Sequence, residues 1–283
     1  MSTPPSSSSG ASSGSSSGPP PVEIHRERSV AESFGTDPMG YDRWRPRYPQ
    51  PLIDRILATS PGREVLDVGI GTGIVARQLR DAGAEVVGVE PDLRMAAFAR
   101  SFGFEVEESR IEDWDPRGRT FDALVAGQTW HWVDPATGAA KARQVLRPEG
   151  RIALFWNAGD APAAVTAAYA DAFAKAVPDW PGQIGRTPPP AAQLYTTIAD
   201  RAADGLRSVG GFSEPERWQD AWQQPYTREE YLAMLPTQGT LTRVPAERVA
   251  PVLEAVGAAI DRLGGSFVME YVTTTVSTTR LTG

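Results

Sequence analysis

The sequence predicts an α/β fold in which helices wind along both faces of a mostly parallel sheet, with an added helical portion toward the C-terminus. Two observations predict this fold. Short apolar segments alternate with helical stretches between residues 63 and 157, and the first apolar segment ends in a cluster of glycines. Strands that alternate with helices at this spacing form βαβ units. Apolar strands without in/out alternation fit a sheet that is covered on both faces.

The N-terminal 60 residues are expected to contain no strand. Residues 1–22 consist almost entirely of Ser, Gly and Pro, and they carry too little apolar surface to offset the entropy of ordering. We therefore expect a disordered tail. Residues 23–60 are expected to form an N-terminal cover of turns and short helices, because prolines interrupt the segment around residues 46–51. Leu52, Ile53, Ile56 and Leu57 follow at helical spacing and predict a helix at its end.

The predicted core spans residues 61–160. Its strand candidates are residues 65–68, 85–89, 104–106, 121–126 and 151–156. Helical spacing predicts helices at residues 74–79, 92–99 and 135–146. This regular alternation indicates a parallel sheet with one helix after each of several strands.

The alternation stops after Asn157. The C-terminal part, residues 161–283, contains helix candidates at 161–177, 228–235 and 246–263, a proline-broken loop at 179–190, and strand candidates at 218–222 and 267–278. We interpret this part as an elaboration of the same α/β domain.

Composition excludes several kinds of function. The 283 residues contain no cysteine and two histidines, which excludes disulfide scaffolds and cysteine-ligated metals and leaves little basis for any metal site. The net charge of −7 argues against nucleic acid as a partner. There is no apolar run of membrane-spanning length and no secretory signal pattern, so we expect a cytoplasmic protein that does not enter membranes.

The glycine cluster, Asp67-Val68-Gly69-Ile70-Gly71-Thr72-Gly73, follows the first predicted strand. A glycine-rich turn at this point of a doubly wound sheet is where such folds bind nucleotides, although it is also compatible with a tight turn that binds nothing. The spacing differs from the G-x-G-x-x-G of dinucleotide folds and from a P-loop. Asp67 would repel a diphosphate, but it suits a ligand that carries an ammonium group.

A second acid follows the second predicted strand. Glu90 lies 21 residues after Gly69, where a carboxylate can accept two hydrogen bonds from a ribose diol. The alternative is an ordinary surface acid at the end of a strand.

With these motifs, the chain resembles the class I S-adenosylmethionine-dependent methyltransferases, in the small-molecule branch that includes trans-aconitate methyltransferase-like and type 11 enzymes. The resemblance runs from about residue 33 to residue 157 and is weaker at the C-terminus. Besides the glycine loop, it rests on Val89-Glu90-Pro91, on Ile111-Glu112-Asp113-Trp114, on the segment Phe121 to Trp132, and on Leu146 to Arg151. Trp114 departs from the smaller residue usual at its position.

The resemblance implies a Rossmann-like, seven-stranded sheet whose last strand is antiparallel, with helical cap elements over a substrate pocket. Residues 161–283 would supply the substrate-cap helices and the last two strands of the sheet. It implies S-adenosylmethionine as the cofactor and S-adenosylhomocysteine as the product. The residues it assigns to cofactor binding are Tyr41, Arg45, Asp67, Gly69, Gly71, Gly73, Glu90, Pro91, Met95, Ile111, Glu112 and Gln128. Within this family, the expected protein is a monomer or homodimer acting on a small molecule.

Methyl transfer is an in-line displacement that needs mainly alignment and a shaped, dry site. His131 is the imidazole positioned to act as a catalytic base, or alternatively a packing residue. Trp130, Trp132 and Trp156 either favour an apolar or aromatic acceptor or belong to the core. The acceptor is expected to be an oxygen or nitrogen nucleophile, for example a carboxylate. The alternative function is a cofactor-binding, regulatory protein of the same fold, and a collapsed cap would favour it.

Overall fold

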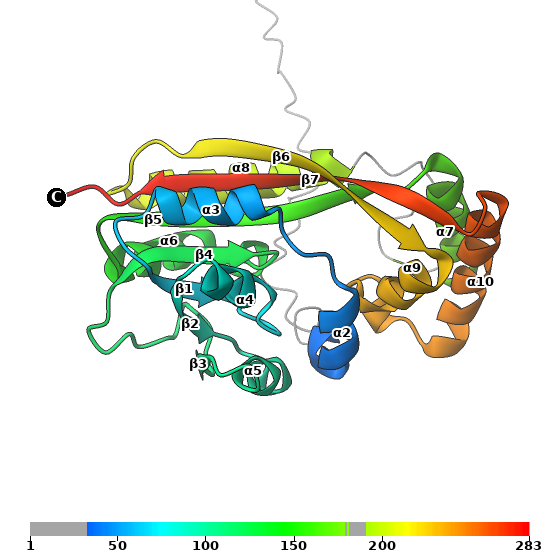
Figure 1. Cartoon of the computed structure of the whole chain (residues 1–283), viewed down its shortest axis with the longest axis horizontal. Coiled ribbons are helices and arrows are strands. Elements are labelled where there is room, and N and C mark those ends of the chain that lie inside the picture. The colour runs from blue at the N-terminus through cyan, green and yellow to red at the C-terminus, as the bar shows by residue number, and fades with distance from the viewer. Residues whose placement is uncertain (1–32, 179, 181–190, 283) are drawn as a thin grey trace, which may run out of the picture.

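The computed structural model describes residues 33–178, 180 and 191–282, so the predicted tail and most of the predicted 179–190 loop lie outside it. Seven strands form one sheet in the order β3-β2-β1-β4-β5-β7-β6 (Figure 1). The strands are β1 (Glu64–Val68), β2 (Glu85–Val89), β3 (Glu105–Glu107), β4 (Phe121–Gly127), β5 (Leu146–Asp160), β6 (Glu216–Thr227) and β7 (Ser266–Thr279). β1 to β5 pair in parallel, and β7 is antiparallel to both of its neighbours. The predicted seven-stranded sheet with an antiparallel last strand is confirmed.

Helices cover both faces of the sheet, as the unbroken apolar strands require. α3 (Gln50–Ala58) and α4 (Ile74–Asp81) lie on the near face in Figure 1, whereas α6 (Pro135–Val145) and α8 (Ala191–Val209) lie on the far face. α5 (Leu93–Arg100) packs beside β3 at the edge of the sheet. α2 (Pro38–Trp44) and the short 3-10 helix η2 (Phe34–Thr36) lie before the first strand.

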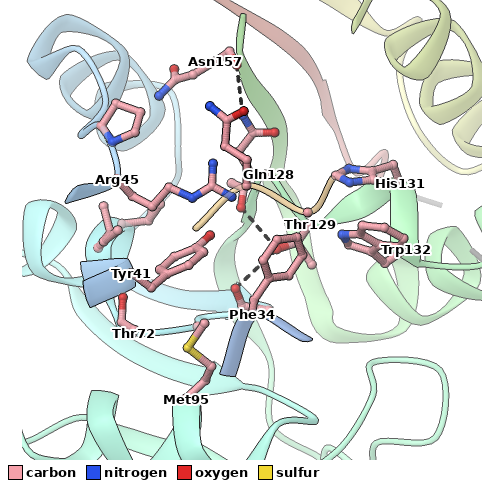
Figure 2. A pocket seen from close by; sticks show the side chains of 18 of the residues that line it. Phe34, Tyr41, Arg45, Thr72, Met95, Gln128, Thr129, His131, Trp132 and Asn157 are labelled. Carbon is pink, nitrogen blue, oxygen red and sulfur yellow. Dashed lines mark hydrogen bonds between the residues drawn. The ribbon is translucent and has the colours of Figure 1, made fainter. Parts of the chain in front are cut away.

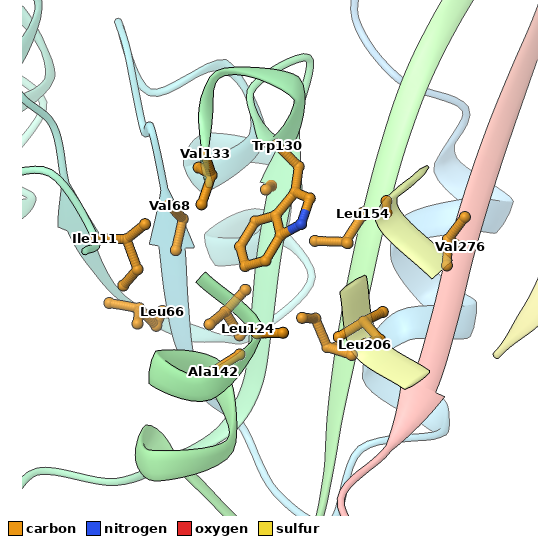
Figure 3. Close-up of a cluster of buried hydrophobic side chains, with 14 of the residues drawn as sticks. Leu66, Val68, Ile111, Leu124, Trp130, Val133, Ala142, Leu154, Leu206 and Val276 are labelled. Carbon is orange, nitrogen blue, oxygen red and sulfur yellow. The ribbon is translucent and has the colours of Figure 1, made fainter. Parts of the chain in front are cut away.

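The core is divided by the sheet into two apolar layers. In β4, Ala123 and Val125 face the layer under α3 and α4, and Leu124 and Ala126 face the layer under α6 and α8. Successive strand residues point to opposite faces, so a strand buried on both faces needs apolar residues at every position. Figure 3 shows the second layer, in which Trp130 packs between strand side chains and is 2% exposed. Trp130 is therefore a core residue.

Helix α8 is not predicted by the sequence pattern. Its inward side consists largely of small side chains, and they pack against α6, β5 and β7. Among the residues of this helix whose burial is described, the buried ones are Ile198, Ala199, Ala202, Ala203, Gly205 and Leu206. α8 thus completes the far layer of the sheet and is not a cap helix.

The cap is built on the extended ends of three long strands. β5, β6 and β7 continue past the other strands toward α7 (Ala163–Ala176), α9 (Arg228–Met234) and α10 (Ala246–Arg262) (Figure 1). Two 3-10 turns, η4 (Leu235–Thr237) and η5 (Leu241–Arg243), follow α9. These helices enclose an apolar cluster of their own, which includes Phe173, Val252 and Val256. None of the helices in the described ranges is long and apolar enough to cross a membrane.

Candidate active site

A cavity of about 1240 Å³ lies between the carboxyl ends of the central strands and the cap. In an open α/β sheet, ligands bind where the strand order reverses, which here is between β1 and β4. On the sheet side, the cavity walls come from the carboxyl ends of β1, β2 and β4 with the loops that follow them, from the loop after β3, and from the distal part of β5. The lining residues there lie within 68–72, 89–95, 109–112, 127–133 and 157–161.

The glycine loop forms the floor beside β1. Gly69 has φ 66° and Gly71 has φ 56°, which is a left-handed backbone that favours glycine. A Cβ atom at Gly69 would come within 2.3 Å of the Thr129 side chain. A Cβ atom at Gly71 would meet only the Gly69 carbonyl, at 3.9 Å, and would extend into open space. Gly71 therefore leaves room for a ligand to approach the backbone, whereas Gly73 lies outside the cavity lining at the start of α4.

Glu90 joins the glycine loop to the loop after β2. One carboxylate oxygen accepts a hydrogen bond from the Gly71 N–H at 2.9 Å, and the other accepts one from the Asp92 N–H at 2.9 Å. The side chain is buried, and burial raises its pKa to about 7 even though both backbone hydrogen bonds lower it. Each oxygen can still accept a further hydrogen bond, and Glu90 lines the cavity.

Three buried polar atoms around this floor have no hydrogen-bond partner among the residues that the structure describes. They are Arg45 Nε, Asp67 Oδ2 and Thr72 Oγ1. Buried polar groups are ordinarily paired, so a cluster of unpaired ones indicates a site that a polar ligand completes. Asp67 lies behind the loop and does not line the cavity. Burial, and then the charge of Glu90, raise the pKa of Asp67.

Arg45 extends into the cavity from the segment that follows α2. Its guanidinium lies 4.8 Å from the centre of the Tyr41 ring and 5.7 Å from that of Phe34, at cation–π distance. Figure 2 shows it between Tyr41, Gln128 and Asn157. Within the described ranges, Arg45 has no carboxylate within 4 Å.

A chain of hydrogen bonds holds this N-terminal segment against the sheet. Asn157 Nδ2 donates to the Arg47 carbonyl at 3.1 Å, and Asn157 Oδ1 accepts from Thr273 Oγ1 at 2.7 Å. Thr273 in turn accepts from Trp222 Nε1 at 2.8 Å. The position of Arg45 therefore depends on residues of β5, β6 and β7.

Gln128 follows β4 with a backbone φ of 54°, which is unusual for a residue with a side chain. Its N–H donates to the Phe155 carbonyl at 2.9 Å, and its side-chain Nε2 donates to the Asn157 carbonyl at 3.0 Å. Such backbone strain is typical of functional sites. Gln128 thus joins the wall after β4 to the distal part of β5.

His131 lies in the 3-10 helix η3 (Trp130–Trp132) on the opposite side of the cavity from Tyr41 (Figure 2). Its Nδ1 accepts a hydrogen bond from Trp156 Nε1 at 3.1 Å. Burial lowers its pKa to about 4. Trp132 lines the cavity next to it, whereas Trp156 is fully buried and belongs to the core cluster that contains Trp130.

Most of the predicted cofactor residues surround this one cavity; Asp67 and Gly73 are the two that do not line it. The predicted residues in the lining are Tyr41, Arg45, Gly69, Gly71, Glu90, Pro91, Met95, Ile111, Glu112, Gln128 and His131. Glu112 also accepts a hydrogen bond from the Asp134 N–H at 3.1 Å, which fixes the loop after β3.

Several lining residues were not predicted. Thr72 lies inside the glycine loop, and its position between two glycines was the available signal. Tyr195 comes from α8, which had not been assigned. The cap contributes Thr166, Tyr169, Tyr231, Met234, Arg243, Met269 and Tyr271. Their sequence pattern showed only helix or strand, and folding brings them to the cavity.

The strand order, the antiparallel β7 and a cavity over the glycine loop define a class I methyltransferase fold. Comparison with known proteins agrees. Residues 66–154 match the family described as "Methyltransferase domain". An uncharacterized methyltransferase of Mycobacterium tuberculosis is 38% identical over 140 residues, which cover 47% of this chain and 55% of that protein. The chain thus spans about half the length of this curated relative.

A malonyl-[acyl-carrier protein] O-methyltransferase of Pseudescherichia vulneris is 28% identical over 73% of this chain and 88% of its own length. Among solved structures, one described as a type II methyltransferase from Anaeromyxobacter dehalogenans superposes with a TM-score of 0.61 and 22% identity, covering 84% of this chain and 99% of that one. Residues 66–154 thus match a methyltransferase domain family, and the chain as a whole has the fold of the solved methyltransferase.

Proposed function

We propose that the chain transfers a methyl group from S-adenosylmethionine to a small-molecule acceptor. The observation that carries the proposal is the set of polar groups around the glycine loop. Glu90 lines the cavity, the unpaired atoms of Arg45 and Thr72 belong to lining residues, and the unpaired atom of Asp67 lies behind the glycine loop. These groups match the ribose diol, carboxylate and ammonium of one S-adenosylmethionine molecule. The Haemonchus contortus phosphoethanolamine N-methyltransferase 2 structure, with a TM-score of 0.50, contains S-adenosylmethionine.

Each part of the ligand has a residue of suitable chemistry. Glu90 accepts the two ribose hydroxyls, and Arg45 pairs with the carboxylate. Asp67 favours the ammonium group, whose charge would lower the raised pKa of Asp67. Ile111 and Glu112 border the adenine, and Met95 packs near the adenosine.

When bound, S-adenosylmethionine supplies an activated methyl group on a sulfonium, which the acceptor attacks in line. The residues of the chain contribute alignment and exclusion of water. Gln128 ties the wall after β4 to β5 through its hydrogen bonds, Arg45 extends into the cavity, and the cap helices cover it. The aromatic groups near Arg45 also suit a sulfonium cation.

The acceptor is an oxygen or nitrogen nucleophile on a small molecule with an apolar or aromatic body. The cap side of the cavity is lined by tyrosine, methionine and leucine side chains, with Arg243 among them. The cavity also exceeds the roughly 300–1,000 Å³ of usual ligand pockets, which leaves room for an acceptor beside the cofactor. An open cavity under the cap supports methyl transfer over a binding protein that does not methylate.

Calorimetric titration with S-adenosylmethionine tests the proposal. We expect binding by the wild type and a loss of about 1–3 kcal/mol in Glu90→Ala, the cost of removing hydrogen bonds to a charged acceptor. Glu85→Ala is the matched control, because Glu85 lies at the exposed, opposite end of β2. Labelled methyl donor then identifies the acceptor class among carboxylates, phenols and amines. A folded wild type that does not bind the cofactor would refute the proposal.

A further inference from the structure

The two nitrogens of His131 have different surroundings. Nδ1 faces Trp156, whose indole N–H donates to it at 3.1 Å. Nε2 has no hydrogen-bond partner in the part of the chain that the structure describes, and the side chain lines the cavity. Trp156 is fully buried in the core of the far layer, so its N–H group has a fixed position.

An indole nitrogen can only donate a hydrogen bond, so the partner nitrogen must carry a lone pair. In a neutral imidazole, the proton is then on the other nitrogen, Nε2. If the proton were on Nδ1, the Nδ1–H of His131 would face the indole N–H of Trp156, and a buried donor would be left without an acceptor. That arrangement is disfavoured roughly 5- to 150-fold. Burial also lowers the pKa of His131 to about 4 with no contribution from a charged group, so the ring is neutral at physiological pH.

We propose that Trp156 fixes His131 in the tautomer protonated at Nε2, so that His131 offers a hydrogen-bond donor to the methyl acceptor instead of removing its proton. The inference rests on the proposed function for the identity of the acceptor site. Trp156 is a positioning residue, because it acts through His131. His131 then donates a hydrogen bond to one lone pair of an acceptor that enters already deprotonated, such as a carboxylate. The acceptor attacks the methyl carbon with another lone pair, the methyl–sulfur bond breaks with its electrons on sulfur, and S-adenosylhomocysteine leaves, so no proton has to be removed.

The tautomer can be measured directly in the full-length protein. The chain has two histidines, so labelling histidine with ¹⁵N gives two sets of ring signals, and His25→Asn leaves only those of His131. We expect the long-range ¹H–¹⁵N pattern of a neutral ring protonated at Nε2, unchanged from pH 6 to pH 9. A ring protonated at Nδ1, or a transition to imidazolium within that range, would overturn the proposal.

A matched pair of variants tests the role of Trp156. Trp156→Phe removes the indole N–H, and the Nδ1-protonated form of His131 should become populated. Trp132→Phe changes a ring whose centre lies 4.6 Å from that of His131 but which has no hydrogen bond to it within the described ranges, so the tautomer should stay unchanged. An unaltered tautomer in folded Trp156→Phe would refute the assignment, and if that variant does not fold, the wild-type spectrum still decides.

The tautomer of His131 can be tested independently of the proposed function. Failure of S-adenosylmethionine to bind would refute the proposed function, whereas the histidine spectrum would still report the tautomer. The activity test uses whichever of the carboxylate, phenol or amine acceptors the wild type methylates. His131→Gln keeps an N–H donor, so its kcat/KM should be at least tenfold higher than that of His131→Leu. Equal loss in both variants would mean that the N–H donor makes no contribution and would overturn the inference.

Discussion

Glu90 should make nucleoside binding depend on pH. Its pKa in the free protein is about 7 because the carboxylate is buried. A ribose diol donates hydrogen bonds to the ionised form, so binding lowers that pKa and releases the proton. With a free-state pKa near 7, about 0.9 of the carboxyl groups are protonated at pH 6 and about 0.1 at pH 8. The affinity should therefore fall about tenfold between pH 8 and pH 6.

The assay is calorimetry with 5′-methylthioadenosine, which keeps the ribose and adenine but lacks the ammonium group that would also perturb Asp67. Titrations in buffers of different ionisation enthalpy count the protons released on binding. We expect about 0.9 proton per ligand at pH 6 and about 0.1 at pH 8 for the wild type. Glu90→Gln should bind more weakly without releasing protons, and Glu85→Gln should behave as wild type. No proton release at pH 6, or the same pH dependence in Glu90→Gln, would refute the reasoning.

Three further predictions concern stability and the loop. The raised pKa of Glu90 means that the folded protein holds this proton more tightly than the unfolded chain does. The free energy of unfolding should therefore fall by about 3 kcal/mol as the pH rises from 4.5 to 7. Urea titrations should show that this pH-dependent contribution is missing in Glu90→Gln. Thr273→Val should lower the free energy of unfolding by about 1–3 kcal/mol, because it leaves Asn157 and Trp222 without their hydrogen-bond partner. Thr275→Val removes a buried hydroxyl that has no partner in the described chain, so it should be neutral or stabilising. If urea titrations find Thr275→Val to be the more destabilising variant, the hydrogen-bond network is contradicted. Gly71→Ala and Gly83→Ala should each lower the free energy of unfolding by about 1–2 kcal/mol, because both glycines have positive φ. Calorimetry should find weaker S-adenosylmethionine binding only in Gly71→Ala, since of these two glycines only Gly71 lines the cavity. Equal affinity of the two variants would mean that the loop is not part of the binding site.

The sheet and its glycine loop could be predicted because their signals are local. β2 has the predicted bounds, and β1 and β4 differ from theirs by one residue, since a strand buried on both faces is a continuous apolar run. α8 was missed because its buried side consists mainly of alanines, which give a weak apolar pattern. β5 extends beyond its predicted range at both ends. Its distal end, residues 157–160, pairs with β7, more than 100 positions away along the chain. At its start, Leu146 pairs with Phe121 of β4, where the sequence predicted a turn.

In the site, too, features with local sequence signals could be predicted, and contacts between distant segments could not. Glu90 and the glycines could be predicted from fixed spacing after strands. Asn157 and Thr273 could not, because their role arises from hydrogen bonds between distant segments. The role of His131 depends on Trp156, which is 25 residues away along the chain and belongs to the core. A sequence motif identifies the imidazole, but only the fold determines which of its nitrogens accepts a hydrogen bond.

Without a ligand, the groups of the site lower the free energy of unfolding, and this destabilisation indicates that a ligand normally pairs with them. Unpaired buried atoms at Arg45, Asp67 and Thr72, the raised pKa values of Asp67 and Glu90, and the left-handed backbone of Gln128 each lower the stability of the free protein. A ligand that pairs these groups relieves the penalties in the folded state alone. By mass action, S-adenosylhomocysteine at about 100 times its Kd should add about 2.7 kcal/mol to the free energy of unfolding. Because the relief comes from pairing, Asp67→Asn should reduce the affinity for S-adenosylhomocysteine but not for 5′-methylthioadenosine. Equal loss for both ligands would mean that Asp67 supports the loop and does not serve the ammonium group.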